Sequence, residues 1–205
     1  MNRLVPPARP HRDRDRLIRV LVNLGISANL PVLVFIRGHY LDSMGEKGKN
    51  DINVYDDSCY LIADNFNTFE SWNANTDPSF VRRGGRNLAR INLGLYDFYQ
   101  GLHRGKYNAL RAFPEGVRIP CTRDGVASTA QYINIHKGGT SPRSVNVTHS
   151  EGCLTIPDTQ YGDFISRVYD AMNRARQKTV KVVLLENRPT PSGQRWHDSS
   201  GRVIA

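Results

Sequence analysis

The feature that most constrains the fold is a series of short segments rich in β-branched and aromatic residues, separated by Gly, Pro, Asn or Asp. They read "PVLVFIR", "CYLIAD", "GLYDFYQG", "YNALRAF", "QYINIH" and "SVNVT". This spacing favours an antiparallel β-sheet or sandwich over repeated βαβ units, in which each strand is followed by a helix. The segment "TVKVVLLEN", residues 179–187, predicts a closing strand of the same sheet.

Two segments have helical periodicity instead. Between Asp13 and Ile26 the apolar positions follow a helical period, and Gly25 can end the helix. A longer helix begins after Pro157 and Asp158 and runs to about Gln177, with one apolar face made of Tyr161, Phe164, Ile165, Val168, Met172 and Ala175. The predicted fold class is therefore α+β, mainly β.

The length of 205 residues gives room for one domain with tails. We expect a basic N-terminal extension over residues 1–29, in which the proline- and arginine-rich residues 1–12 are disordered and a short helix follows. The main domain is predicted over residues 30–188. Residues 189–205 are predicted to be a polar and loose C-terminal tail.

Composition excludes several classes of protein. With 39% hydrophobic and 23% charged residues, and no uninterrupted apolar run long enough to cross a bilayer, the chain is predicted to have no transmembrane segment. The start "MNRLVPPARPHRDRDRL" has charges and prolines where a secretory signal has an apolar core, so we expect a protein made in the cytoplasm without Sec-type export.

The net charge of +9 means that the surface attracts polyanions such as nucleic acid, anionic lipid or an acidic cell-wall polymer. The basic residues are spread along the chain without a nucleic-acid recognition motif, so no specific nucleic-acid partner is predicted.

Three cysteines, Cys59, Cys121 and Cys153, are an odd number without a Cys-x-x-Cys pair. Neither a disulfide framework nor a standard zinc site is indicated, and at least one thiol is free. His149 lies four residues before Cys153, but no second Cys/His pair completes a ligand set. We expect no metal and no cofactor.

The stretch "INIHKGGTSPRSVNVTHSEGCLTIP", Ile133 to Pro157, contains the candidate catalytic residues. The alternation in "QYINIH" places His136 on one face of a strand, with the isoleucines on the other face. Gly138 and Gly139 allow a sharp turn and a close approach of the backbone to a ligand.

Cys153 follows His136 by 17 positions (153 − 136) and comes directly after Gly152. The thiolate is the reactive form of cysteine, and a nearby imidazole can generate it, so this pair is a candidate nucleophile and base. The alternative is that Cys153 is a small buried apolar residue and His136 a hydrogen-bonded structural one.

This stretch resembles the signature of the L,D-transpeptidase (YkuD-like) family, in which a strand-borne histidine followed by glycine precedes a Ser/Thr-His-Gly-Cys element. The matching residues are His136, Gly138, Ser150, Gly152 and Cys153. Three positions depart from the family pattern, because Glu151 stands in place of the usual histidine, Thr155 in place of the usual arginine or asparagine, and Lys137 separates the histidine from the first glycine.

The resemblance implies a YkuD-like β-sandwich that attacks the L,D bond of a peptidoglycan stem peptide. His136 would take the proton of Cys153, which we expect to be partly ionised near neutral pH, and the thiolate would form a thioester acyl-enzyme. Backbone N–H groups around Gly152 and Cys153 would hold the oxyanion, and Ser150, Gly138 and Gly139 would shape the site. A backbone carbonyl next to the histidine is expected to orient it.

Glu151 has two interpretations. It is either a solvated loop carboxylate or a functional group that binds the amine of a stem peptide, stabilises an imidazolium at His136 or raises the thiol pKa. His103 in "GLHRG" and Asp77 in "NTDPS" are further candidates for the same cleft, although turns made of such residues are mostly structural.

Three functions remain open at this point. The departures at Glu151 and Thr155 favour a cysteine hydrolase of peptidoglycan, acting as an L,D-carboxypeptidase or endopeptidase, over an L,D-transpeptidase that forms 3–3 cross-links. The third possibility is a non-catalytic basic wall-binding or structural protein on the same fold. The segments "RGHYLDSMG", "NVYDD" and "NANTDPS" are similar to proteins of phages of Gram-negative hosts, so we expect an endolysin or an antibacterial effector that reaches the anionic cell wall by holin-type release or by injection.

Overall fold

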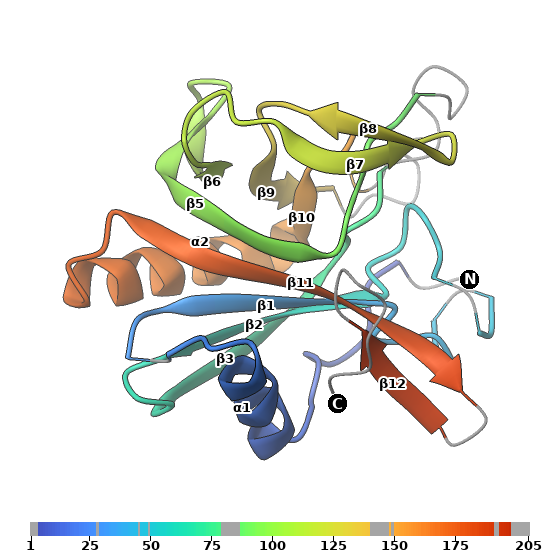
Figure 1. Cartoon of the computed structure of the whole chain (residues 1–205), viewed down its shortest axis with the longest axis horizontal. Helices are drawn as coiled ribbons and strands as arrows, with labels where there is room; N and C mark the ends of the chain where they lie inside the picture. The colour runs from blue at the N-terminus through green and yellow to red at the C-terminus, as the bar shows by residue number, and fades with distance from the viewer. Residues whose placement is uncertain are drawn as a thin grey trace.

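The computed structural model describes residues 4–27, 29–44, 46–48, 50–78, 87–139, 148, 150–190 and 193–197. Figure 1 shows a mainly β fold with two helices, which confirms the predicted fold class. The elements are α1 (Arg14–Asn23), β1 (Val32–Arg37), β2 (Asp57–Ala63), β3 (Thr68–Ala74), β4 (Arg90–Ile91), β5 (Gly94–His103), β6 (Tyr107–Ala112), β7 (Ile119–Arg123), β8 (Val126–Ala130), β9 (Asn134–Gly138), β10 (Leu154–Pro157), α2 (Asp158–Arg174), β11 (Thr179–Thr190) and β12 (Gly193–His197).

The strands form a large sheet that closes on itself and a small second sheet. The order in the large sheet is β10-β9-β6-β5-β11-β1-β2-β3, with β12 paired to β11, and the small sheet has the order β4-β7-β8. Asn75, just after β3, and Thr155 in β10 exchange two backbone hydrogen bonds of 2.9 Å. The two ends of the large sheet therefore meet, and the sheet approaches a barrel.

The large sheet is mixed, so the prediction of a purely antiparallel sheet is wrong for two strand pairs. Strand β1 runs parallel to β11, and β9 runs parallel to β10. Parallel neighbours need a long connection between them. Such connections exist here, because residues 139–153 separate β9 from β10 and most of the fold separates β1 from β11.

Strand β1, which lies in the predicted strand segment "PVLVFIR", is buried on both of its faces. Leu33 and Phe35 point into the main core, which α2 covers, whereas Val32, Val34 and Ile36 pack with α1. The two helices therefore lie on opposite sides of the layer that contains β1 (Figure 1).

Both predicted helices are confirmed, with shorter bounds. Asp13 caps α1, because its side chain accepts hydrogen bonds from the N–H groups of Asp15 and Arg16. Helix α2 starts after Pro157 and contacts β3 through the edge-to-face pair of Trp72 and Phe164. Neither helix of the described chain is long and apolar enough to cross a membrane.

The two predicted loose ends are ordered where the structure describes them. In the N-terminal segment, the carbonyls of Leu4, Ala8 and Pro10 accept hydrogen bonds from β3 and from the segment before β2. In the C-terminal segment, residues 193–197 form β12 beside β11. The predictions of disorder over residues 4–12 and of a loose tail at residues 193–197 are therefore wrong. The domain boundaries themselves stay a prediction.

Several strands were missed by the sequence interpretation. The antiparallel hairpin of β7 and β8 turns at Asp124 and Gly125, both with positive φ, and this Asp-Gly pair is a typical hairpin signal. The predicted strand "SVNVT" falls mostly on residues 144–147, which lie outside the described residues.

Candidate active site

The candidate base His136 lies in β9, and the candidate nucleophile Cys153 comes directly before β10, the parallel partner of β9. Leu154 pairs with Ile135 and Thr155 with His136, so Cys153 lies opposite Asn134. The Asn134 N–H donates a hydrogen bond of 3.4 Å to Cys153 Sγ. Because alternate residues of a strand share a face, His136 and Asn134 point to the same side, and Ile135 enters the core. The predicted alternation is confirmed.

His136 is held in one tautomer. Its Nδ1 lies 2.8 Å from the carbonyl oxygen of Lys137, which can only accept a hydrogen bond. The Nδ1 atom therefore carries the hydrogen, and Nε2 of the neutral ring is left as the proton acceptor. The Lys137 carbonyl thus occupies the place of the backbone carbonyl that was expected to orient the histidine.

A second histidine packs on the first. The His103 ring stacks on the His136 ring with a centroid distance of 4.2 Å, and Asn134 Nδ2 lies 3.1 Å from His103 Nδ1. Burial lowers the pKa of His103, and the charge of Arg104 lowers it further. The neutral His103 ring therefore fixes one face of His136 without adding a positive charge beside it.

The Cys153 thiol is half-buried and protonated at neutral pH. Burial raises its pKa to about 11; the Asn134 N–H and the charge of Arg104 act in the opposite direction, and Glu151 raises the pKa further. The expectation of a thiol partly ionised near neutral pH is therefore wrong, because the sequence does not report how deeply the sulfur is buried. A base must remove the proton as the sulfur reacts.

Ser150 closes the turn before the cysteine. Its Oγ donates to the Cys153 carbonyl oxygen at 2.5 Å and accepts from the Gly152 N–H at 3.0 Å. A Cβ atom on Gly152 would lie 2.8 Å from both Cβ and the carbonyl oxygen of Ala89. Only glycine lets this turn pack so closely against the segment before β4.

Gly138 and Gly139, which were expected to shape the site, contact Tyr55 instead of lining the cleft. The Tyr55 hydroxyl donates a hydrogen bond of 2.6 Å to the Gly139 carbonyl, and a Cβ atom on Gly138 would overlap that hydroxyl. Neither glycine lines the cleft that contains Cys153. Gly138 therefore makes room for the Tyr55 side chain, and Gly139 accepts its hydrogen bond.

The site opens into a cleft of about 500 Å³. Its lining includes His103, His136, Glu151, Gly152 and Cys153 from the predicted set, and also the residues Arg104, Arg123, Tyr132 and Asn134, to which the sequence interpretation gave no role. Arg104 follows His103 directly in the sequence, so its position could have been inferred from that neighbour. Arg123 lies on the missed β7–β8 hairpin and gave no such signal.

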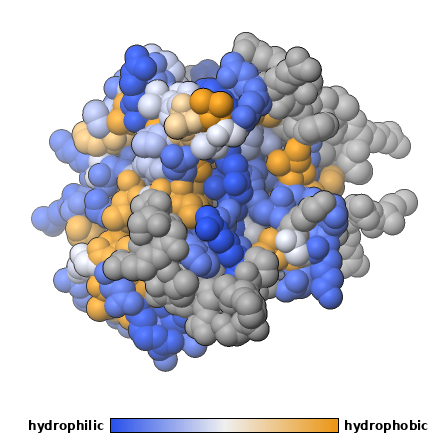
Figure 2. All heavy atoms as spheres, turned by 45° about the vertical axis from the view of Figure 1, so that its right-hand side comes forward, coloured by the Kyte–Doolittle hydropathy of each residue, from blue (hydrophilic) through white to orange (hydrophobic). Residues whose placement is uncertain are grey.

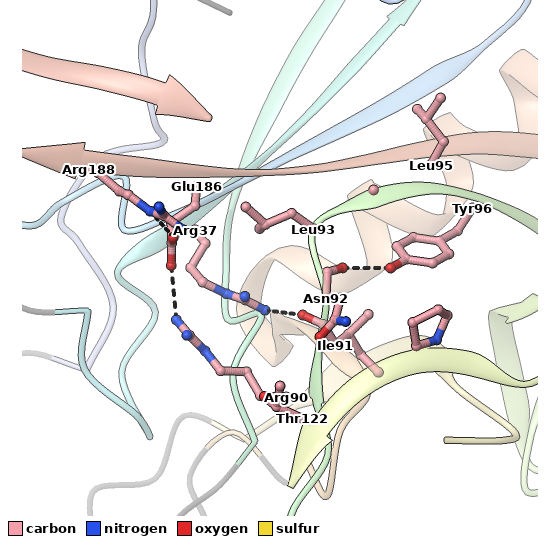
Figure 3. A pocket seen from close by; sticks show the side chains of 12 residues that line it. Arg37, Arg90, Ile91, Asn92, Leu93, Leu95, Tyr96, Thr122, Glu186 and Arg188 are labelled. Atoms are coloured by element: carbon pink, nitrogen blue, oxygen red, sulfur yellow. Dashed lines mark hydrogen bonds and ion pairs between the residues drawn. The ribbon is translucent and has the colours of Figure 1, made fainter. Parts of the chain in front are cut away.

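Asp77 does not line this cleft, contrary to the possibility raised above. It is buried beside a second hollow of about 510 Å³, which we call the arginine pocket. The charged residues that line this pocket are Arg37, Arg90, Glu186 and Arg188. The other lining residues are Ile91, Asn92, Leu93, Gly94, Leu95, Tyr96, Pro120 and Thr122. Arg37 and Arg90 both form ion pairs with Asp77, at 3.4 and 2.7 Å. Arg90 and Arg188 both pair with Glu186, and Figure 3 shows these side chains turned toward one another.

Within the described ranges, no three His, Cys, Asp or Glu side chains gather in a way that could hold a metal ion.

Figure 2 shows hydrophilic side chains over much of the described part of one face, with separate apolar patches between them.

The fold and the cleft thus define a mainly β protein in which a cysteine and a hydrogen-bonded histidine face the same cleft. No protein-family model, curated protein or solved structure matches the chain.

Proposed function

We propose that this protein is a cysteine hydrolase that cleaves L,D bonds of peptidoglycan stem peptides through a thioester acyl-enzyme, on a YkuD-like fold. The observation that carries the proposal is the placement of His136 in β9 and of Cys153 directly before the parallel strand β10, so that both line one cleft, with His136 Nδ1 held by the Lys137 carbonyl. The substrate class comes from the resemblance of residues 133–157 to the L,D-transpeptidase signature.

The mechanism begins with a proton transfer. His136 Nε2 takes the proton from Cys153 Sγ while the sulfur attacks the carbonyl carbon of the scissile bond, since a thiol with a pKa of about 11 is not ionised beforehand. The imidazolium then gives this proton to the leaving amine as the carbon–nitrogen bond breaks. The product of this half-reaction is the thioester.

Water completes the reaction. The same imidazole takes a proton from the attacking water and returns it to the leaving sulfur, which restores the thiol and releases a carboxylic acid. The Cys153 N–H is the proposed oxyanion donor, because Ser150 Oγ accepts the Gly152 N–H. Ser150 and Gly152 hold the backbone in place for that donor.

Hydrolysis is favoured over transpeptidation by the two departures from the family pattern. Thr155 is fully buried at the seam where β10 meets the segment after β3, so it offers no side chain to an acceptor peptide. Glu151 lines the cleft, and its charge adds to the effect of burial in raising the pKa of the Cys153 thiol. A phage endolysin or an injected antibacterial effector is the proposed setting, with the peptidoglycan of the cell wall as the partner.

Digestion of purified sacculi, followed by mass analysis of the products, tests this function. We expect free D-alanine and shortened stems without new 3–3 cross-links, and no change with the Cys153→Ala protein. New 3–3 cross-linked dimers with little free D-alanine would show a transpeptidase instead. Unchanged sacculi would support the non-catalytic alternative.

A further inference from the structure

Arg104 lies in a turn that presents it to the candidate active site. The Lys106 N–H donates a hydrogen bond of 3.0 Å to the His103 carbonyl, and Arg104 and Gly105 have φ values of +50° and +69°. These features define a type I′ hairpin turn, whose central positions favour Asn, Asp and Gly. The chain instead has an exposed arginine at the first of them, directly after the histidine that stacks on His136.

The charge of Arg104 is not neutralised by the described part of the chain, where no carboxylate forms an ion pair with it. Among the residues that the structure describes, two arginines and one acidic residue, Glu151, line the cleft. The other arginine, Arg123, donates a hydrogen bond to the Asn87 carbonyl and is held at the rim. The Arg104 charge also acts on the nucleophile, since it opposes the rise in the pKa of Cys153.

The chemistry of an L,D bond places a carboxyl group in the cleft that Arg104 lines. The residue on the leaving side is a D-amino acid, and its α-carboxylate carbon is separated from the scissile carbonyl carbon by one nitrogen and one Cα, a distance of about 3–4 Å. When the scissile carbonyl lies at Cys153 Sγ, that carboxylate must lie inside the same cleft. A guanidinium binds a carboxylate through two parallel hydrogen bonds.

We propose that Arg104 binds the free α-carboxylate of the D-amino acid on the leaving side, and so determines which L,D bonds are cleaved. This inference rests on the proposed function. Bonds followed by a D residue with a free carboxylate are substrates, and bonds followed by a D residue whose carboxyl group is an amide are spared.

Two synthetic tetrapeptide stems test this selectivity, one ending in a D-alanine carboxylate and the other in D-alaninamide. We expect kcat/KM for the carboxylate peptide to exceed that for the amide by about 10- to 100-fold. Arg104→Asn removes the charge but suits the turn, so it should bring the two values to within about threefold while the fold is kept. Arg104→Lys keeps the charge and should retain part of the preference.

Arg176→Asn is the matched control, because Arg176 is also exposed and also has a positive φ, of +52°, but lies just after α2 and away from the cleft. It should keep the full preference. An unchanged preference in Arg104→Asn, or equal cleavage of both peptides by the unmodified protein, would overturn the assignment.

Binding separates this inference from the proposed function. The Cys153→Ala protein should bind the carboxylate peptide more tightly than the amide by a similar factor, and adding Arg104→Asn should remove the difference. This result would support the subsite even if the unmodified protein cleaved neither peptide, an outcome that would refute the hydrolase. Equal affinity of Cys153→Ala for both peptides would overturn the subsite.

Discussion

The cleft that contains Cys153 and the arginine pocket have nearly the same volume, and arginines line both, but the arginines differ in whether carboxylates pair with them. In the arginine pocket Arg37, Arg90 and Arg188 share the carboxylates of Asp77 and Glu186. In the cleft, Arg104 has no such partner among the residues that the structure describes. A cation is available to a ligand only when the protein does not already pair it, so the number of arginines alone does not identify a binding site.

The arginine pocket is an extension of the polar core. Asp57, at the start of β2, accepts hydrogen bonds from the N–H groups of Gly38 and Thr76, both at 2.6 Å. Arg37 donates to the Thr76 hydroxyl and to the carbonyls of Thr76 and Ile91. These contacts tie the ends of β1, β2 and β3 to β4, so we expect the residues of the arginine pocket to stabilise the fold.

The largest expected effect is a loss of activity on substitution of a residue in the cleft. His136→Ala should lower kcat/KM for a tetrapeptide stem by about 10²- to 10⁴-fold, because the base that removes the Cys153 proton is lost. His11→Ala, which changes an exposed histidine outside the cleft, is the control and should have no effect. Wild-type kinetics in a folded His136→Ala protein would contradict the role of this histidine as the base.

The next largest expected effect is a loss of stability on substitution of a residue in the arginine pocket. Arg37→Met removes the buried guanidinium that pairs with Asp77 and whose charge acts on the buried Asp57, so the free energy of unfolding should fall by about 3–5 kcal/mol. Urea denaturation measures this loss. A loss below about 1 kcal/mol would mean that the pocket does not stabilise the fold and that its arginines are open to a ligand.

Alkylation by iodoacetamide measures the ionisation of the cleft thiol. Cys153 should react before Cys59 and Cys121, which are fully buried. Only the thiolate reacts, and burial raises the Cys153 pKa to about 11, so the rate should rise about tenfold per pH unit between pH 7 and 9. Peptide mass analysis locates the label, and a rate that levels off near pH 8 would show a thiol pKa lower than the structure gives.

The smallest effect is expected at the rim of the arginine pocket. The Arg188 side chain is 49% exposed and pairs with Glu186 at the surface, so Arg188→Asn should change the free energy of unfolding by less than about 1 kcal/mol. Its kcat/KM for the tetrapeptide should equal that of the unmodified protein. A clear loss of activity in Arg188→Asn would mean that substrate extends from the cleft into this pocket.

The sequence predicted what depends on local pattern. The periodicities located α1, α2 and β1, and the alternation in "QYINIH" placed His136 opposite the core-facing Ile135. Features that depend on distant partners were not predictable in this way. The parallel partner of β1 comes from the far end of the chain, and the raised pKa of Cys153 depends on how deeply the fold buries its sulfur.

The candidate site shows the same division. The pair of His136 and Cys153 was identified from spacing and resemblance, but Gly138 makes room for Tyr55, which lies 83 positions earlier in the chain (138 − 55). Arg123 reaches the cleft from a hairpin that no periodicity revealed. The sequence therefore indicated the proposed nucleophile and base, whereas the charged residues that surround them could be located only from the fold.

The release of D-alanine from a defined tetrapeptide stem, measured for the unmodified protein and for Cys153→Ala, is the decisive test of the cysteine mechanism. We expect steady release by the unmodified protein and none above background by Cys153→Ala. The denaturation curve of Cys153→Ala should match that of the unmodified protein, since only one sulfur atom at the edge of the core is removed. Full release by a well-folded Cys153→Ala protein would contradict the cysteine mechanism.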